Sequence, residues 1–326
     1  MSAAITTDQL SKYFGDFAAV DSLSLEVRAG EVFGFLGPNG AGKSTTIRCL
    51  LDLYHATSGS AELLGLDSHV DSLEIRRRIG YLPADVALYG NLTGGETIEY
   101  FANLRGGVEQ KKIDELAERF GADLSKKASE YSSGNRQKDG LIQAFMHEPD
   151  LVIMDEPSTG LDPLVQQEFH ELVGEVRADG RTVFLSSHTL SEVERVADRV
   201  GIIRHGKLVE VATIDELKSK AVRRLDLEFA EVVDATAFDG VPGIRDAEGV
   251  GHHLSVSYDG AIEPVLTRAT QLGVINLNSR DADLEEIFLT YYRDDDEAGV
   301  ESKAVADATS TDSVASATEE AANAAR

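Results

Sequence analysis

A glycine-rich segment near the N-terminus constrains this chain more than any other feature of its sequence. Residues 37–44 read Gly-Pro-Asn-Gly-Ala-Gly-Lys-Ser, which fits the pattern G-x4-G-K-[ST]. The segment follows a short apolar run at residues 31–36 and precedes a stretch with helical periodicity at residues 44–54. A strand, a glycine turn and a helix in this order indicate a phosphate-binding loop. We therefore predict an α/β fold of the P-loop NTPase type.

The residue types in this loop suit a chain of phosphates. Gly37, Gly40 and Gly42 let the backbone curl so that its N–H groups point at phosphate oxygens. The N-terminus of the following helix adds partial positive charge. Lys43 is a cation that reaches the β- and γ-phosphates, and the Ser44 hydroxyl is a ligand for Mg²⁺. Chance would supply about 0.01 such matches in a chain of this length, so a fortuitous turn is a poor alternative.

An apolar run followed by two acids is the second half of such a site. Residues 151–154 are Leu-Val-Ile-Met, and Asp155 and Glu156 come directly after them. Buried parallel strands present side chains at their carboxyl ends, where ligands bind. We expect Asp155 to belong to the Mg²⁺ shell and Glu156 to accept a proton from the attacking water. Without the phosphate loop, this short run would be a weak signal.

Strands alternate with helices over the first two thirds of the chain. Residues 1–30 alternate in short apolar stretches, which favours an antiparallel subdomain, and residues 92–145 favour a helical subdomain. Further short apolar strands are expected at residues 182–185 and 200–203. This alternation predicts a mainly parallel sheet with helices on both faces.

The pattern changes after about residue 220. Alternating apolar residues at 225–229 and 254–258, with helical patterns at 261–272 and 283–292, indicate a small α+β domain. Residues 294–326 are mostly acidic residues and residues with small side chains. We expect an ATP-binding domain at 1–219, the small domain at 220–293 and a disordered acidic tail at 294–326.

The charge of the chain is strongly negative. It contains 31 Lys and Arg against 57 Asp and Glu, a formal net charge of −26. This balance argues against a basic surface for nucleic acid, and we expect no nucleic-acid partner. The acids are spread along the whole chain. This favours adaptation to a salty, halophilic cytoplasm over an acidic surface for one partner.

The sequence also bears on location. No apolar run approaches the roughly 18 residues that span a bilayer, and the first ten residues show no signal-peptide pattern. Cys49 is the single cysteine, so neither a disulfide framework nor a cysteine zinc site is expected. These features predict a chain that stays in the cytoplasm.

Four segments together resemble the ATP-binding subunit of an ABC transporter. They are GPNGAGKST (37–45), YSSGNRQK (131–138), LVIMDEPSTGLD (151–162) and FLSSH (184–188), and the resemblance covers about residues 5–219. It implies a head-to-tail homodimer that closes on two ATP molecules. Each ATP is then held by the phosphate loop of one subunit and the signature segment, residues 131–135, of the other.

The resemblance also implies roles for individual residues. Glu156 matches the catalytic base, and His188 matches the histidine that contacts the γ-phosphate. Phe14 takes the place of an aromatic that stacks on adenine, although a core phenylalanine is the alternative. The implied nucleotide contacts are Phe14, Gly37, Pro38, Asn39, Gly40, Ala41, Gly42, Lys43, Ser44, Thr45, Ser132, Gly134 and Asp162, and the implied Mg²⁺ ligands are Ser44 and Asp155.

Two segments depart from the family pattern. The signature, usually LSGGQ, is here Tyr-Ser-Ser-Gly-Asn, which keeps the two phosphate-contacting positions Ser132 and Gly134. The glutamine that usually follows a stretch such as IGYLP is replaced by Ala84, with Asp85 next to it. Such loops, and a C-terminal extension ending like residues 283–288, resemble exporter-type subunits that pair with a separate membrane permease.

We expect a transport ATPase that uses ATP and Mg²⁺ and binds a polytopic permease at the inner face of the membrane. The helical subdomain and residues 85–91 would form the docking surface. One alternative is a soluble, non-transport ABC ATPase. Another is a nucleotide-gated binding module with little hydrolysis, which the retained Glu156 and His188 disfavour.

Overall fold

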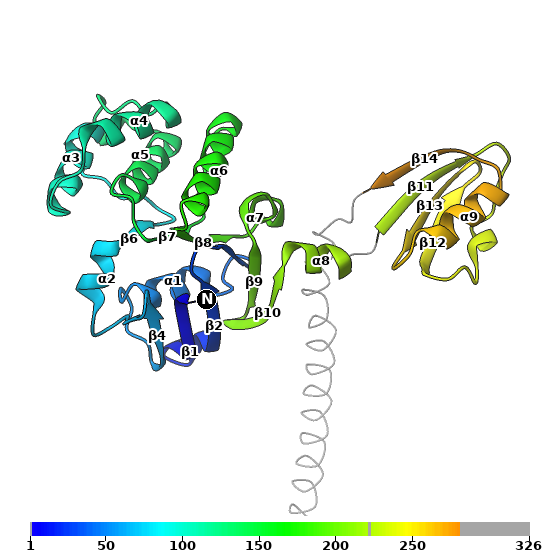
Figure 1. Ribbon diagram of the computed structural model, residues 1–326, viewed down its shortest axis with the longest axis horizontal. Helices are drawn as coiled ribbons and strands as arrows, with labels where there is room; N and C mark the ends of the chain where they lie inside the picture. The colour runs from blue at the N-terminus through cyan, green and yellow to red at the C-terminus, as the bar shows by residue number, and fades with distance from the viewer. Residues whose placement is uncertain (1, 221–222, 281–326) are drawn as a thin grey trace, which may run out of the picture. The chain divides into compact units, whose positions relative to one another are not determined.

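The computed structural model describes residues 2–220 and 223–280. The chain forms two compact units, Met1–Glu216 and Leu217–Arg326 (Figure 1). The helix expected at 283–292 and the acidic tail expected at 294–326 lie outside the described residues.

A six-stranded sheet forms the centre of the first unit, in the order β10-β9-β3-β8-β7-β6. All neighbours are parallel except β10, which pairs antiparallel with β9. β3, β7 and β8 are buried at every position, as their continuous apolar runs predict. The expected parallel sheet is therefore confirmed. The strands are β3 (Val32–Leu36), β6 (Ile79–Leu82), β7 (Leu151–Asp155), β8 (Thr182–Ser187), β9 (Arg199–Arg204) and β10 (Lys207–Thr213).

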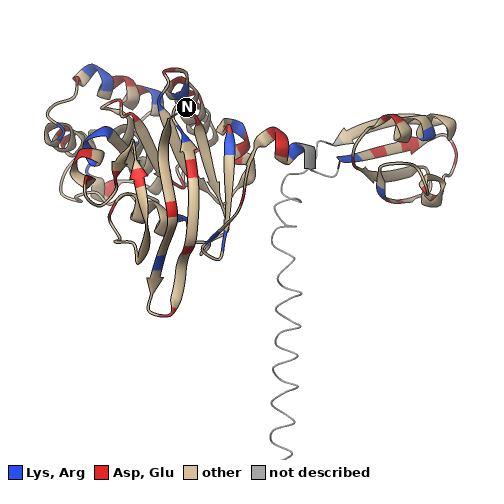
Figure 2. Ribbon diagram, turned by 60° about the horizontal axis from the view of Figure 1, so that its bottom comes forward, with Lys and Arg blue, Asp and Glu red and all other residues tan. Residues whose placement is uncertain are grey.

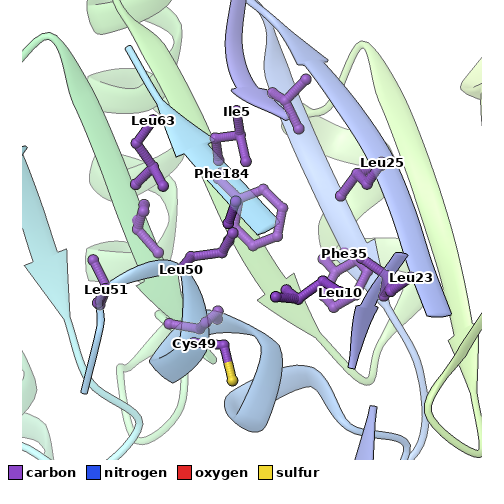
Figure 3. Packing of buried hydrophobic residues seen from close by; sticks show 14 of the residues in the cluster. Ile5, Leu10, Leu23, Leu25, Phe35, Cys49, Leu50, Leu51, Leu63 and Phe184 are labelled. Atoms are coloured by element: carbon purple, nitrogen blue, oxygen red, sulfur yellow. The ribbon is translucent and has the colours of Figure 1, made fainter. Parts of the chain in front are cut away.

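A four-stranded antiparallel sheet, β2-β1-β4-β5, packs over the first sheet, as the alternation in residues 1–30 predicts. Helix α1 (Lys43–Leu50) lies between the two sheets, and its Ile47 and Leu50 share one core with Ile5 and Phe35 (Figure 3). The second sheet and the core thus hold the helix that follows the phosphate loop. Its strands are β1 (Ala3–Phe14), β2 (Phe17–Arg28), β4 (Ser58–Leu63) and β5 (Leu66–Asp67).

Helix α1 ends four residues earlier than the helical pattern at 44–54 predicts. Asp52 has a φ of 52°, in the left-handed region, which stops a right-handed helix. The backbone N–H groups of Leu53 and Tyr54 both turn back to the carbonyl oxygen of Arg48, at 2.8 and 3.0 Å. The helix was predicted too long because the apolar residues after Leu50 continue the helical spacing in the sequence, although the backbone leaves the helix there.

The helical subdomain contains α3, α4 and α5, as expected for residues 92–145, and the short 3₁₀ helix η1 (Ala128–Glu130) lies between α4 and α5. α3 begins at a capping box, in which Thr93 and Glu96 each bond the other's backbone N–H. The helices of the first unit besides α1 are α2 (Ser72–Arg78), α3 (Gly94–Leu104), α4 (Gln110–Phe120), α5 (Ser133–Phe145), α6 (Pro163–Ala178) and α7 (Leu190–Val196), and α8 (Ile214–Lys220) spans the division between the units.

The second unit is an antiparallel sheet in the order β12-β13-β11-β14, with helix α9 (Glu263–Gln271) packed on its core face. The two strands expected at 225–229 and 254–258 are confirmed as β11 (Arg223–Phe229) and β13 (His253–Tyr258). We did not predict the edge strands β12 (Ile244–Val250) and β14 (Val274–Arg280). β12 is mostly exposed and therefore lacks the apolar alternation that marks a half-buried strand.

Candidate nucleotide site

The phosphate loop joins β3 to α1, where the sequence predicts it. Two of its glycines are required by close backbone contacts. A Cβ on Gly37 would lie 2.5 Å from the carbonyl oxygen of Ile203, and one on Gly42 would lie 2.4 Å from that of Ala19. Gly42 also has a φ of 111°. The loop is tied to the sheet by a 3.2 Å bond from the Gly37 N–H to the Ser187 carbonyl. Close backbone contacts therefore require glycine at Gly37 and Gly42, and the positive φ also favours it at Gly42.

Lys43 is the first residue of α1 and is almost fully buried, with 6% of its surface exposed. Its Nζ donates to the carbonyl oxygens of Gly37 and Pro38, at 2.6 and 3.2 Å. The same atom lies 3.2 Å from Oε1 of Glu156. The loop therefore holds a dehydrated ammonium group against itself, and a dehydrated cation attracts anions more strongly than a hydrated one.

Asp155 and Glu156 leave the carboxyl end of β7 in different environments. Asp155 is 1% exposed, and its Oδ1 accepts a 2.6 Å bond from the Ser186 hydroxyl. The same hydroxyl oxygen accepts a bond from the Glu156 N–H at 3.1 Å. Ser186 therefore positions both acids. We missed it in the sequence, although aligning the parallel strands β7 and β8 pairs Asp155 with Ser186 directly.

Glu156 connects the phosphate loop to His188. One of its carboxylate oxygens faces Lys43, and the other lies 2.6 Å from Nδ1 of His188. Glu156 has a φ of 52°, which is rare for a glutamate and typical of residues held in place for function. His188 follows β8 and is half exposed, so its imidazole is accessible from solvent. Lys43, Glu156 and His188, expected from three separate motifs, form one continuous row.

The signature segment lies at the start of α5. Ser132 caps this helix, with its Oγ accepting a 3.2 Å bond from the Asn135 N–H. A Cβ on Gly134 would lie 2.7 Å from the Gly160 carbonyl oxygen, so this position also requires glycine. Within residues 2–220 and 223–280, no hydrogen bond or ion pair joins Ser132 or Gly134 to residues 37–45. The structure therefore does not bring the signature segment onto its own phosphate loop.

Gln137 links the signature helix to the catalytic turn. Its side chain is buried, and its Nε2 donates to the carbonyl oxygens of Pro157 and Glu156, at 2.8 and 3.4 Å. Asp162 caps α6 by accepting from the N–H groups of Leu164 and Val165, both at 3.1 Å. We assigned no role to Gln137 in the sequence, because a single glutamine carries no signal of its partner.

The remaining predicted positions differ in how far they are exposed. Phe14 is 46% exposed, so the alternative that it is a core phenylalanine is wrong. Its ring packs edge-on against Tyr54, with centroids 5.6 Å apart. Ala84 and Asp85 follow β6 and are both exposed. In the loop itself, Ala41 is buried, Pro38, Ser44 and Thr45 are partly buried, and Asn39 and Gly40 are exposed.

A buried lysine on a phosphate loop, two carboxylates and an imidazole define a P-loop ATPase. A family model described as "ABC transporter" matches residues 20–159. The bacitracin transport ATP-binding protein BcrA of Bacillus licheniformis is 37% identical over 279 residues, which cover 85% of this chain and 89% of that protein. The chain therefore belongs to the ABC transporter family as an ATP-binding subunit, and it is an ATP hydrolase.

Two further comparisons agree with this assignment. The probable multidrug ABC transporter ATP-binding protein YbhF of Escherichia coli is 40% identical over 222 residues, which cover 67% of this chain and 38% of that protein. A solved structure described as the ATP-binding subunit of an ABC transporter has a TM-score of 0.63 and 30% identity, and covers 67% of this chain and 92% of that one. Among the described residues, no helix has the length and apolar character needed to cross a membrane.

Proposed function

We propose that this chain binds MgATP, works as a head-to-tail homodimer and drives a separate membrane permease for export. The observation that carries the proposal is the row formed by Lys43, Glu156 and His188, with 3.2 Å between the first pair and 2.6 Å between the second. A cation, a carboxylate and an imidazole in contact provide a phosphate anchor, a general base and a group that orients the base.

Each of these groups has a distinct task in hydrolysis. Lys43 and the N–H groups of the loop bind the β- and γ-phosphates. Glu156 takes a proton from the water that attacks the γ-phosphate, and His188 holds the Glu156 carboxylate and contacts the same phosphate. Phe14 offers a ring that is 46% exposed and on which adenine can stack, while Tyr54 packs edge-on against it and Lys12 Nζ lies 5.1 Å from its centroid.

The oxygen donors at the loop suit Mg²⁺. Asp155 supplies a buried carboxylate and Ser44 a hydroxyl, both of them hard oxygen ligands, and such ions are held by one or two carboxylates together with substrate phosphates. The Ser186 hydroxyl occupies only Oδ1 of Asp155 in one direction, so the carboxylate keeps lone pairs for an ion. Bound Mg²⁺ would neutralise part of the phosphate charge.

Ser132 and Gly134 serve the ATP of the neighbouring subunit. They lie at the N-terminus of α5, where a hydroxyl, a glycine and free N–H groups attract an anion. Since no hydrogen bond or ion pair among the described residues joins either of them to the chain's own phosphate loop, we expect them to meet a γ-phosphate across a dimer. Asp162, which caps α6, belongs to the loop that senses the nucleotide site on the opposite side of the dimer.

Mixed dimers test this arrangement. Chains with Ser132→Arg and chains with Lys43→Ala each form homodimers with two broken sites, so each should be inactive alone. A mixed dimer combines one doubly broken site with one intact site, and ATPase activity should return on mixing. If the signature segment served its own loop, both sites of the mixed dimer would be singly broken. Mixing would then restore nothing, and the sandwich dimer would be refuted.

The membrane partner is proposed from the relatives and from the surface. One relative is named for bacitracin transport and another for multidrug transport, and a cell benefits from expelling such compounds. The helical subdomain and residues 85–91 present Tyr89, Tyr100 and Leu104, which are 57%, 47% and 66% exposed. Rings of Tyr89 and Tyr100 are in contact, with centroids 6.4 Å apart. These residues would receive a permease loop at the inner face of the cell membrane.

Reconstitution with the permease separates this function from that of a soluble ABC ATPase. The permease to test is a polytopic protein of about six spans encoded beside this chain. We expect the permease to recruit the chain to vesicles and to raise its ATPase rate. Tyr89→Ala with Tyr100→Ala should reduce both effects and leave ATP binding unchanged. Absence of recruitment would favour the soluble alternative.

A halophilic setting is proposed from the charge distribution. Figure 2 shows acidic residues spread over helices and strands of both units, and the chain as a whole carries −26. Carboxylates dispersed in this way retain water and repel one another, and salt screens that repulsion.

A further inference from the structure

A second group of ionisable side chains lies away from the catalytic row. It consists of Asp52, just after α1, His55, three residues further on, and His69, in the segment between β5 and α2. Oδ1 of Asp52 lies 2.9 Å from Nδ1 of His55 and 3.1 Å from Nδ1 of His69. One carboxylate oxygen therefore faces two imidazole nitrogens that come from different parts of the chain.

The backbone positions Asp52. Its left-handed φ of 52° directs its side chain at the point where α1 ends. Arg76 donates from Nη2 to the carbonyl oxygen of Leu51, at 3.2 Å, which ties this turn to α2. The Asp52 side chain is 12% exposed, so its location is set by packing rather than by solvent.

Separate hydrogen bonds hold the backbone of each histidine. Lys12 donates from Nζ to the His55 carbonyl oxygen, at 2.8 Å. Oδ1 of Asp67 accepts from the N–H groups of His69 and Val70, both at 2.9 Å, which orders the turn that carries His69. The backbones are thus fixed, while the imidazoles themselves are 72% and 69% exposed and open to ions in solution.

The electrostatics of the cluster favour a cation. The cluster lines a cavity of about 440 Å³ that also includes Asp67 and Ser68. Burial opposes the ionisation of Asp52, yet the hydrogen bonds from His69 and His55 hold its pKa below the usual value. The Asp52 carboxylate supplies the negative charge of the cluster, and the two imidazoles supply nitrogen donors. The two rings meet edge-on, with their centroids 4.9 Å apart.

We propose that Asp52, His55 and His69 bind a divalent transition-metal ion, Zn²⁺ being the best fit, through Oδ1 and the two Nδ1 atoms. The three atoms all lie within 4.8 Å of one another. In a tetrahedral site with bonds of about 2.1 Å, ligand atoms are about 3.4 Å apart, close to the 2.9 and 3.1 Å measured here. The fourth position opens to the cavity and takes water.

The donor set selects the class of metal. Two imidazole nitrogens with one carboxylate suit Zn²⁺, Ni²⁺ or Cu²⁺, whereas Mg²⁺ requires oxygen ligands. The site is therefore chemically distinct from the Asp155 site. Its position gives it a mechanical consequence, because it clamps the C-terminal end of α1, whose first residue is Lys43, to the turn before α2.

Metal titration of the full-length protein tests the site. We would titrate the protein with Zn²⁺ at about pH 7.5. In a parallel titration with Co²⁺, the absorption of the bound ion reports coordination without depending on ATPase activity. We expect one ion per chain and a rise in Tm. His55→Ala and His69→Ala should each weaken binding by at least about tenfold, as should Asp52→Asn.

The variants are chosen so that the result is decisive. Asn tolerates a positive φ, so Asp52→Asn removes the charge while keeping the backbone turn. His253→Ala removes an exposed histidine on β13 and should leave binding unchanged. Binding that survives His69→Ala and Asp52→Asn, no binding at all, or displacement of Zn²⁺ by millimolar Mg²⁺ would each overturn the proposal. None of these outcomes affects the assignment of the phosphate loop, which Lys43→Ala tests separately.

Discussion

Glu156 joins the phosphate loop to His188 through its two carboxylate oxygens, one 3.2 Å from Lys43 Nζ and the other 2.6 Å from His188 Nδ1. The carboxylate is 16% exposed, so both contacts operate in a partly dehydrated setting where charges interact strongly. A change at Glu156 therefore affects chemistry while leaving the loop, which is built from glycines and backbone carbonyls, intact.

Glu156→Gln should bind ATP and hardly hydrolyse it. The amide keeps the size of the side chain but cannot accept the proton of the attacking water, and loss of a general base typically costs 10²–10⁴-fold in rate. Turnover and ATP affinity would be measured on the same preparation, together with the trapped dimer by size exclusion. Glu62→Gln, on the exposed side of β4, is the control and should behave like the parent. Near-parental turnover would move the base elsewhere, with Asp85 the next candidate.

Lys43→Ala should abolish tight MgATP binding. The substitution removes the cation that faces the phosphates and that offsets part of the charge of Asp155 and Glu156, so the pocket becomes more negative. Binding would be followed with a fluorescent ATP analogue. The matched control is Lys111→Ala on α4, whose side chain is 80% exposed and pairs with Glu115 at 3.5 Å. Equal affinities of parent and Lys43→Ala would contradict the assignment of the loop.

Asp139→Asn should stabilise the protein at neutral pH. Asp139 is fully buried in α5, its Oδ2 has no hydrogen-bond partner, and burial raises its pKa to about 6 from 3.8. The folded chain therefore holds this proton more tightly than the unfolded chain. Its contribution to stability is present below about pH 4 and is lost as the pH rises through 6. Removing the charge should recover roughly 2–3 kcal/mol at pH 8 at most.

The pH dependence of the stabilisation by Asp139→Asn tests this prediction. Urea unfolding of parent and Asp139→Asn would be compared at pH 4 and pH 8, where the difference should be near zero and near its maximum, respectively. Asp114→Asn, in the exposed face of α4, controls for charge removal by itself. A gain of the same size at both pH values would show that the effect is unrelated to ionisation.

Salt should raise the stability of the protein. With a net charge of −26, repulsion between carboxylates opposes the folded state, and at about 1 M salt the Debye length falls to roughly 3 Å. The melting temperature would be measured in KCl from low concentration to above about 1 M, with equimolar sucrose as a control for osmotic effects. We expect the maximum at high salt. A maximum at low salt would instead favour a specific acidic surface for one partner.

The local parts of the site were predictable from the sequence because they depend on contiguous residues. Residues 37–44 determine their own backbone, since the glycines and the following helix start act over a few bonds. The apolar run before Asp155 likewise determines a buried strand that ends in acids. Ser132 as a helix cap follows from its own neighbours in the same way.

Only the tertiary structure decided which side chains these site residues contact. Ser186 meets Asp155 from 31 residues away because β7 and β8 are parallel and in one register, and His188 meets Glu156 for the same reason. The Oδ2 atom of Asp139, which is buried without a hydrogen-bond partner, is recognisable only from the tertiary structure. Sequence encodes backbone preference over a few residues, whereas the distance between side chains far apart in the chain is set by how sheets and helices pack.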